Sequence, residues 1–111
     1  MDKLEQYQKL VGRLLEEYSQ LKPAYGQIET EFLVDKDNTS FAVFRTGWLK
    51  DTRIHGAILH VDVKDDKIWI EYDGTDRPIA DELVEAGVPK EDIVLAFQPE
   101  ELRAHTGFAV R

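Results

Sequence analysis

Apolar side chains recur at steps of three and four along the first 21 residues, which is the period of an α-helix with one buried face. Asp2 can accept hydrogen bonds from the free N–H groups at the start of such a helix. Pro23 can end it because proline has no backbone N–H to donate. The pattern predicts a helix over residues 2–21 that packs on the core, rather than a coiled coil, for which barely three heptads are present. The stripe consists of Leu4, Tyr7, Val11, Leu14, Tyr18 and Leu21, widened by Leu10 and Leu15.

From Gln27 to Tyr72 the hydrophobic period changes to two, which is typical of β-strands with two different faces. Turn-forming residues interrupt the pattern at Asp35–Asn38, at Asp51-Thr52 and at Asp65-Asp66. Four strands are therefore predicted, at residues 28–34, 41–49, 54–63 and 67–72. We expect an α+β fold in which the N-terminal helix packs on a four-stranded antiparallel meander.

The two short turns also predict how the strands pair, because a two-residue loop fixes the register of a hairpin. If the loops are Asp51-Thr52 and Asp65-Asp66, both hairpins place the same side of the third strand in one apolar layer. That layer contains Ala57, Leu59, Val61 and Val63, and the N-terminal helix is expected to cover it. The predicted cross-strand pairs are Phe44 with Leu59, Ala42 with Val61, Leu59 with Tyr72, Val61 with Ile70, and Val63 with Ile68.

The opposite side of the predicted sheet is not an ordinary solvent face, which would alternate to fully polar residues. It mixes aromatic and aliphatic side chains with charges, a composition typical of an interface or of a second covered face. Two interpretations remain open: the C-terminal segments fold across this face, or a protein partner binds it. The face contains Phe41, Val43, Arg45, Ile58, His60, Asp62, Trp69 and Glu71, and the candidate partner-interface residues are Phe41, Arg45, His60, Asp62, Trp69 and Glu71.

The remainder of the chain predicts short helices and one more apolar segment. Residues 79–86 read as a helix with Pro78 in its first turn and with Thr75 or Asp76 as a cap. Gly87-Val88-Pro89 is a typical helix stop. Residues 89–92 suit a further helical turn, which leads into the apolar, strand-like run Ile93–Phe97 that closes the sheet.

Length and charge narrow the class of protein. A chain of 111 residues forms one domain, spanning residues 1–111. Its formal net charge of −8 opposes DNA phosphates, so direct DNA binding by this subunit alone is disfavoured and a basic protein partner is favoured. Cysteine is absent, the first residues do not resemble a signal peptide, and no apolar run approaches the ~20 residues that span a bilayer. We expect a cytoplasmic protein that does not enter a membrane.

The titratable residues offer little support for catalysis. Asp51, Asp62 and Lys64 imitate the spacing of a nuclease motif, but the two carboxylates fall near opposite ends of one strand, roughly 35 Å apart, and cannot share a metal ion. In the predicted register His60 lies opposite Glu71, beside Asp62, and these three could form a metal or ligand site. A histidine that faces a carboxylate on a sheet is more often a simple electrostatic pair. We therefore expect no enzyme activity, no cofactor and no metal.

Several segments, in order and spacing along the whole chain, resemble the XisI family. They are Met1–Leu4, Lys22-Pro23, Tyr25-Gly26, Gly47-Trp48, Leu59–Lys64, Lys67–Ile70, Asp73–Thr75, the long run Gly87–Phe97 and the tail Thr106–Val110. The resemblance implies an XisI-like fold and a role as a controlling factor in excision of the cyanobacterial fdxN element, a site-specific DNA rearrangement linked to heterocyst formation. It also implies an XisH-like partner related to endonuclease folds. No catalytic residues come with the resemblance.

Two functional hypotheses follow. In the first, the protein is a non-catalytic accessory factor that binds and controls an XisH-like partner. In the alternative, it is a metal-dependent enzyme or a small-ligand-binding protein that uses His60, Asp62 and Glu71. The sequence leaves open whether the protein also forms a homo-oligomer.

Overall fold

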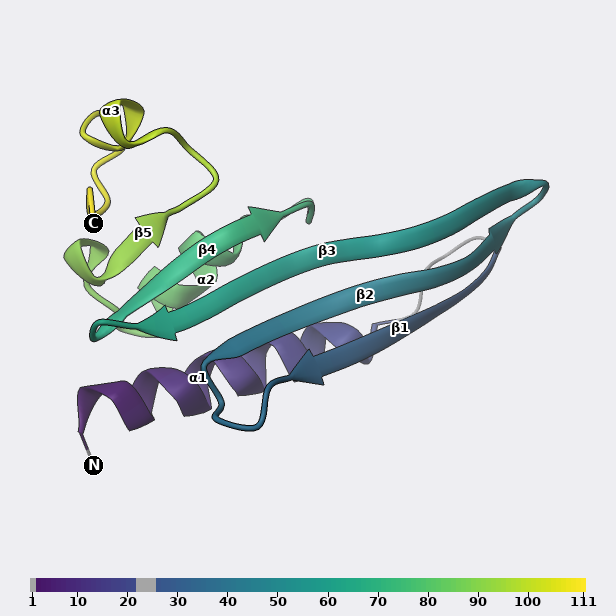
Figure 1. Ribbon diagram of the computed structural model, residues 1–111, viewed down its shortest axis with the longest axis horizontal. Coiled ribbons are helices and arrows are strands. Elements are labelled where there is room, and N and C mark those ends of the chain that lie inside the picture. Colours follow the sequence, from purple (N-terminus) through teal and green to yellow (C-terminus); the bar gives the residue numbers. More distant parts are fainter. Residues whose placement is uncertain (1, 22–25) are drawn as a thin grey trace.

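The structure is a computed structural model, and it describes residues 2–21 and 26–111. Helix α1 (Lys3–Ser19) is followed by the strands β1 (Gln27–Val34), β2 (Ser40–Leu49), β3 (Thr52–Lys64) and β4 (Lys67–Asp73). Then come helix α2 (Ile79–Glu85), the 3-10 turn η1 (Lys90–Asp92), strand β5 (Ile93–Leu95) and helix α3 (Glu100–Arg103). The sheet order is β1-β2-β3-β4-β5, and β5 runs parallel to β4. Figure 1 shows this arrangement.

The predicted α+β fold is confirmed, with one more strand than expected. The first four strands form the antiparallel meander. The strand-like run after η1 adds β5, which makes a mixed sheet of five strands in the described part of the chain. Phe97, at the end of the predicted run, leaves the strand and is exposed. The tail returns to this edge, where the Ala109 N–H donates to the Ile93 carbonyl at 2.9 Å.

Helix α1 begins as the pattern predicts. The Asp2 side chain accepts a hydrogen bond from the Glu5 N–H at 2.8 Å. Tyr7, Val11 and Leu15 are buried, whereas Leu21 is 59% exposed and lies outside the core. The predicted stop at Pro23 falls outside the described residues.

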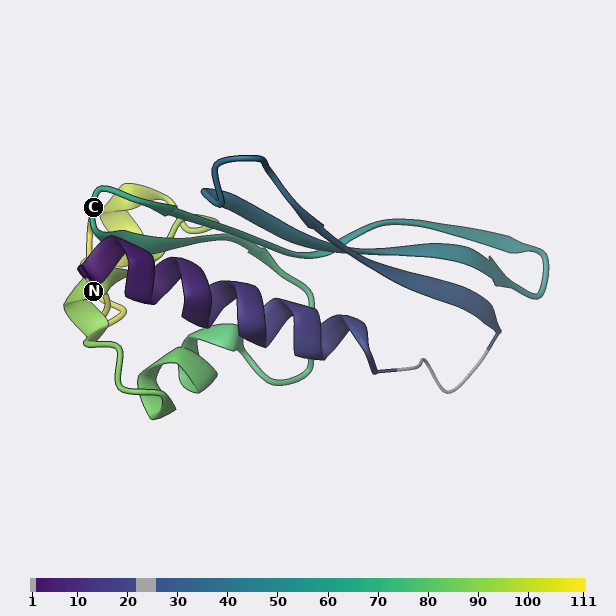
Figure 2. The ribbon, with the colours of Figure 1, turned by 90° about the horizontal axis from the view of Figure 1, so that it is seen from below.

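The core lies between the helices and one face of the sheet. Figure 2 shows α1 and α2 on the same side of the sheet, and a twisted arm of β1, β2 and β3 that continues beyond the end of α1. Among the residues with essentially no exposure are Leu15, Val43, Leu59, Val61, Val63, Ile68, Leu83 and Ile93. Removing such side chains from water is the main stabilising term in folding.

One of the two predicted hairpin loops is correct. Asp65 and Asp66 both have positive φ, 54° and 58°, as the central residues of a type I′ turn require. The loop pairs Val63 with Ile68, and Val61 with Ile70, as predicted. The predicted pair of Leu59 with Tyr72 is wrong, because the register shifts by one residue between His60 and Val61 and leaves Leu59 opposite Asp73.

The other loop lies one residue earlier than predicted. Leu49 pairs with Thr52, so Lys50-Asp51 is the loop, and Lys50 takes the left-handed conformation with φ 55°. A bulge between Val43 and Phe44 shifts the register again. The loop change alters the pairing by two residues and keeps each side chain on its predicted face, whereas the bulge alters it by one residue and exchanges the two sides of β2 relative to Leu59 and Val61. The predicted pairs of Phe44 with Leu59 and of Ala42 with Val61 are therefore wrong; Val43 pairs with Leu59 and Phe41 with Val61.

Helix α2 is found where it is predicted, but its cap comes from another residue. The Asp73 carboxylate, not Thr75 or Asp76, accepts the Ile79 N–H at 2.7 Å, and it also accepts the Thr75 N–H at 2.9 Å. The stop is as expected: Gly87 has φ 103°, and the Val88 N–H donates to the Leu83 carbonyl at 3.0 Å. None of the helices described is long and apolar enough to cross a membrane.

Candidate functional site

The six residues predicted to share one face are divided between the two sides of the sheet. Phe41 is only 3% exposed and belongs to the core, where its ring stacks on Phe32 with 6.5 Å between ring centroids. Arg45 lies on the same side, with its guanidinium carbon 6.0 Å from the centre of the Tyr18 ring. Phe41 and Arg45 therefore face α1 and cannot form one surface with His60. The bulge at Ile58 on β3, which exchanges the sides of β2 relative to Leu59 and Val61, is the cause of this correction.

The side of the sheet without α1 and α2 carries two rows of residues that run across the strands. In the first row Leu33 pairs with Ala42, Ala42 with His60, and His60 with Tyr72. In the second row Ser40 pairs with Asp62, and Asp62 with Trp69. Directly paired residues point to the same face. We call this surface the open sheet face and define it by Leu33, Ala42, His60, Asp62, Trp69 and Tyr72.

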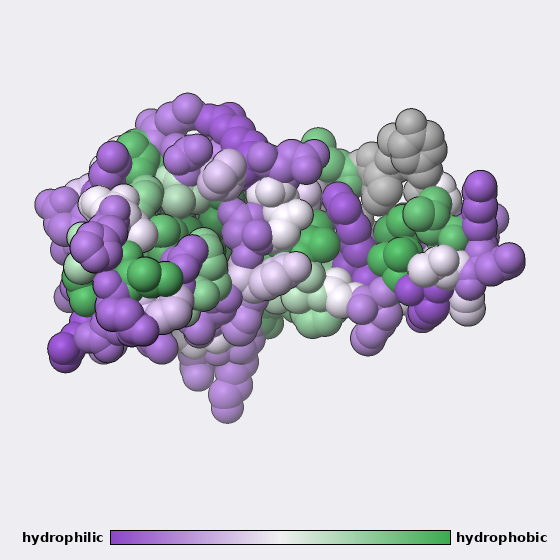
Figure 3. All heavy atoms as spheres, turned by 90° about the horizontal axis from the view of Figure 1, so that it is seen from above, coloured by the Kyte–Doolittle hydropathy of each residue, from purple (hydrophilic) through white to green (hydrophobic). Residues whose placement is uncertain are grey.

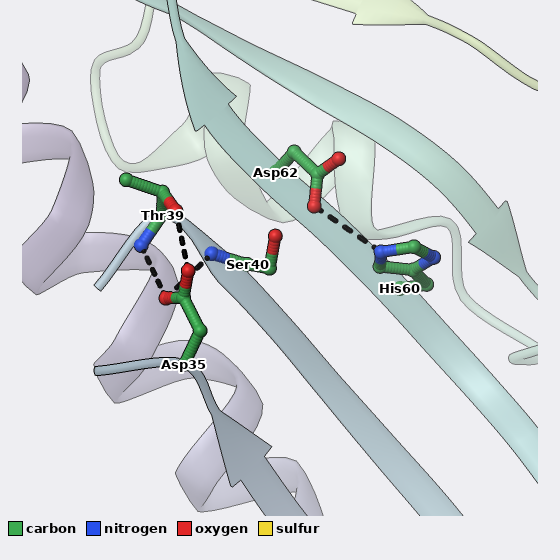
Figure 4. Close-up of polar contacts among 5 residues, drawn as sticks. All are labelled: Asp35, Thr39, Ser40, His60 and Asp62. Carbon is green, nitrogen blue, oxygen red and sulfur yellow. Dashed lines mark hydrogen bonds and ion pairs between the residues drawn. The ribbon is translucent and has the colours of Figure 1, made fainter. Parts of the chain in front are cut away.

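The centre of the open sheet face is a histidine–carboxylate pair. His60 Nε2 lies 3.1 Å from Asp62 Oδ1, and Figure 4 shows the two side chains pointing toward each other along β3. They stand two residues apart on one strand, which places both on the same face. The His60 side chain is 44% exposed and that of Asp62 is 19% exposed. An N–H at Nε2 donates to the carboxylate, so the ring is held in place while its remaining edge meets solvent.

Trp69 is fixed next to this pair. Its indole N–H donates to the Lys64 carbonyl at 3.2 Å, and the Lys64 ammonium lies 4.7 Å from the centre of the ring. A cation close to an aromatic face is attracted by the negative charge of that face. The indole ring is thus fixed in position and half-buried at the edge of the open sheet face, as aromatic residues that anchor protein interfaces commonly are.

Exposed apolar side chains complete the surface. Leu33 is 46% exposed and Tyr72 is 50% exposed. A shallow hollow of about 260 Å³ lies at the Leu33 end of the first row and is also lined by Ala42 and His60. Sequence reasoning missed Leu33, Ala42 and Tyr72. The places of Ala42 and Tyr72 depend on the two register shifts. For Leu33 a signal was available, because β1 alternates so that Leu33 shares a side with Glu29 and Glu31.

Comparisons with known proteins agree with this fold. A family model described as XisI protein matches residues 1–110. The chain belongs to the XisI family. A crystal structure of an XisI-like protein from Anabaena variabilis ATCC 29413 is similar, with a TM-score of 0.89 and 37% sequence identity over 97% of this chain and 99% of that chain. The fdxN element excision controlling factor XisI from the same organism has a TM-score of 0.83 and 30% identity over 99% of this chain and 100% of that chain. No match was found among curated proteins.

In this XisI-family chain the predicted metal or ligand cluster does not assemble. His60 lies opposite Tyr72 rather than Glu71, because Glu71 is the extra residue where β4 shifts register against β3. Within residues 2–21 and 26–111, no group of three or more histidine or acidic side chains could hold a metal ion. The pairing of Asp62 with Trp69 is as predicted, and that of His60 with Glu71 is wrong.

The turn that leads into β2 supports the open sheet face of this family member. The Asp35 carboxylate accepts hydrogen bonds from the Thr39 N–H at 2.7 Å, from the Thr39 hydroxyl at 2.6 Å and from the Ser40 N–H at 3.1 Å (Figure 4). These bonds, first among them that from the Thr39 hydroxyl, lower the pKa of Asp35. The turn therefore delivers Ser40 to the row of Asp62 and Trp69 in a fixed position.

Two polar groups on the helix side lack partners. Thr30 and Arg45 pair directly across β1 and β2. Thr30 Oγ1 and Arg45 Nε are buried and have no hydrogen-bond partner among the described residues. Arg45 Nη2 does reach the Tyr18 hydroxyl, at 3.5 Å. The role of Arg45 in this XisI-family fold is thus to pack between the sheet and the end of α1.

Proposed function

We propose that this protein is a non-catalytic accessory factor that controls a nuclease-like enzyme by binding it through the open sheet face. The partner is an XisH-like protein, and the process is excision of a DNA element of the fdxN type. The observation that carries the proposal is the pair of residue rows on a sheet face that lacks α1 and α2. Around the His60–Asp62 pair, those rows place the half-exposed side chains of Leu33 and Tyr72 and the fixed ring of Trp69.

The chemistry of this face fits a protein surface better than a small molecule. Aromatic anchors surrounded by polar groups are the usual composition of protein interfaces. The hollow beside His60 is shallow and small, at about 260 Å³, whereas small-molecule sites enclose most of their ligand. The relative that is described as the fdxN element excision controlling factor XisI shares 30% identity and almost the full length of the fold, which supports a controlling role.

Net charge supports a protein partner over direct contact with DNA. The chain carries a formal net charge of −8, and an acidic surface attracts a basic protein while it repels phosphates. A nuclease-like partner needs basic residues around its DNA-binding cleft. Control by this subunit therefore acts through the partner, and the same charge complementarity speeds their association.

The test is co-purification of the tagged protein with an XisH-like protein produced in the same cells. Trp69→Ala and Tyr72→Ala are expected to remove the complex. Trp48→Ala is the matched control, since Trp48 is also exposed, at 49%, but stands in the distant arm. Arg45→Ala is a second control, because Arg45 lies on the helix side. A complex that survives Trp69→Ala and Tyr72→Ala would show that the open sheet face is not the docking surface.

A further inference from the structure

Strand β1 is an open edge of the sheet. It pairs with β2 on one side, and within residues 2–21 and 26–111 no strand pairs with its other side. The Asp35 N–H donates to the Ser40 carbonyl. Counting back from this bond shows which residues of β1 are hydrogen-bonded to β2 and which are not. In an antiparallel pair, every second residue directs its N–H and C=O away from its partner. Ile28, Thr30, Phe32 and Val34 therefore present unpaired backbone groups along the outer edge.

Two hollows lie beside this edge. One, of about 900 Å³, follows the first half of β1 toward the end of α1. The other, of about 450 Å³, lies between α1 and the second half of β1, and its apolar lining is Phe32, Val34 and Phe41. The side chains of an added strand would alternate between the open side of the sheet and the helix side. On the helix side they would enter the apolar hollow.

The charge along the edge is negative. Residues that line the two hollows include four carboxylates, Glu5, Glu16, Glu29 and Glu31, but only two cations, Lys9 and Arg53. None of the four carboxylates takes part in an ion pair in the described part of the chain. Arg53 is already engaged, with its guanidinium carbon 5.3 Å from the centre of the Trp48 ring.

This charge pattern argues against a second copy of the chain as the occupant. An antiparallel pairing of β1 with itself about Thr30 would place Glu29 opposite Glu31 of the second copy. A pairing about Glu31 would place that carboxylate opposite itself. Like charges directly opposite each other destabilise a sheet, and charged side chains commonly protect edge strands against self-association.

We propose that β1 binds an extended basic segment of a partner protein as an additional strand of the sheet. In that segment lysine or arginine residues face Glu29 and Glu31, and apolar residues alternate with them and enter the hollow beside Phe32 and Val34. The unpaired backbone groups of β1 supply the affinity, and the carboxylates and the hollow supply the specificity. The proposal concerns β1 and does not depend on binding at the open sheet face.

The test uses the whole protein and a short, capped peptide in which lysine alternates with valine. Binding is followed by the NMR shifts of the protein's backbone amides and by calorimetry. We expect saturable binding that weakens with added salt, with the largest shifts at Ile28, Thr30, Phe32 and Val34. The same peptide with alternate backbone nitrogens methylated cannot complete the ladder and is expected not to bind.

Two variants separate the parts of the proposal. Glu29→Lys/Glu31→Lys should weaken binding roughly tenfold, since two cross-strand charge pairs become repulsive. Thr30→Pro should abolish it, because the proline removes an outward N–H without touching the ladder to β2. The control, Asp76→Lys/Glu101→Lys, makes the same change of net charge at exposed positions away from β1. Equal weakening by the control, shifts that map to the open sheet face, or no binding by the folded protein would each overturn the proposal.

Discussion

The Tyr7 hydroxyl donates a hydrogen bond to the Asp92 carboxylate, and so joins two residues that are 85 positions apart in the chain. Lys3 adds an ion pair to the same carboxylate at 3.0 Å. Asp92 is 6% exposed and ends η1, directly before β5. The first helix is therefore tied to the segment that adds the fifth strand.

Replacing Asp92 by asparagine should lower the free energy of unfolding and make that free energy depend less on pH in the acidic range. Burial alone would raise the pKa of Asp92, but the hydrogen bonds from Tyr7 and Lys3 outweigh it and lower this pKa below the usual aspartate range. The carboxylate thus contributes stability above the unfolded-state pKa, near 3.9, and this is lost as pH falls through the folded pKa. We expect Asp92→Asn to lower the free energy of unfolding by about 1–3 kcal/mol at neutral pH.

The measurement is urea unfolding of wild type and variant at several pH values from neutral to strongly acidic. The difference between the two proteins should shrink as the pH falls below about 4. Glu91→Gln removes a neighbouring exposed carboxylate and serves as the control. A difference that stays constant down to the acid limit would contradict the assigned role of Asp92.

Tyr7 should ionise only at unusually high pH. Burial and the hydrogen bond to Asp92 raise the pKa of Tyr7 well above its ordinary value near 10. Alkaline spectrophotometric titration should show a phenol that ionises only when the protein unfolds. In Tyr7→Phe that late step should vanish, with stability lowered by about 1–2 kcal/mol because Asp92 loses one donor. If Tyr7→Phe leaves the titration curve unchanged, the late step belongs to another residue.

Glycine should stabilise the protein at only one of the two positions of the β2–β3 loop. Lys50 has φ 55°, a conformation that costs a residue with a Cβ roughly 1 kcal/mol and costs glycine nothing. Lys50→Gly is therefore expected to raise the free energy of unfolding by about 0.5–1 kcal/mol. Asp51 does not share the positive φ, so Asp51→Gly should not stabilise. Thermal unfolding of the two variants decides between them, and equal effects would contradict the observed loop.

Variants on the open sheet face should separate binding from stability. The His60–Asp62 pair is partly exposed, and such pairs contribute under about 1 kcal/mol. His60→Ala should therefore lower the free energy of unfolding by less than about 1 kcal/mol while it weakens the complex with an XisH-like protein. Unfolding in urea and co-purification are measured on the same samples. A strongly destabilised His60→Ala would mean that the pair is structural.

The sequence predicts the helices and strands well because their signals are local. The alternation of apolar residues on β3, the two aspartates at its end and the apolar stripe of α1 each specify their element without distant contacts. The faces of β2 are not predictable in this way. Phe41, Val43, Ala42 and Phe44 are all apolar, so either alternate set could be buried. One bulge, at Ile58 on β3, decides which set is buried.

The remaining errors share this cause. A bulge leaves no mark in the sequence when the extra residue, such as Ile58 against β2, has the same character as its neighbours. The bulge at Ile58 put Phe41 and Arg45 on the side opposite to the predicted one. The predicted cluster of His60 with Glu71 failed because Glu71 is itself the extra residue of the second bulge. Asp62 and Trp69 lie close to the well-predicted Asp65-Asp66 loop, where the register has not yet shifted, and His60 keeps its side because it stands two residues before Asp62 on the same strand. Whether they bind a partner stays a prediction.

The chain has 42 Å as its longest dimension, and much of that length comes from the end of the sheet that extends past α1 (Figure 1). Figure 3 shows apolar residues gathered on this arm, separate from those over the C-terminal segments. Trp48 and Leu49 are 49% and 41% exposed there. Both bulges lie between the core and the arm. If one residue is added to β2 and one to β3 near the Lys50-Asp51 loop, the strands therefore keep their faces within the core. The length of the arm can thus be altered while the packing of the core stays the same.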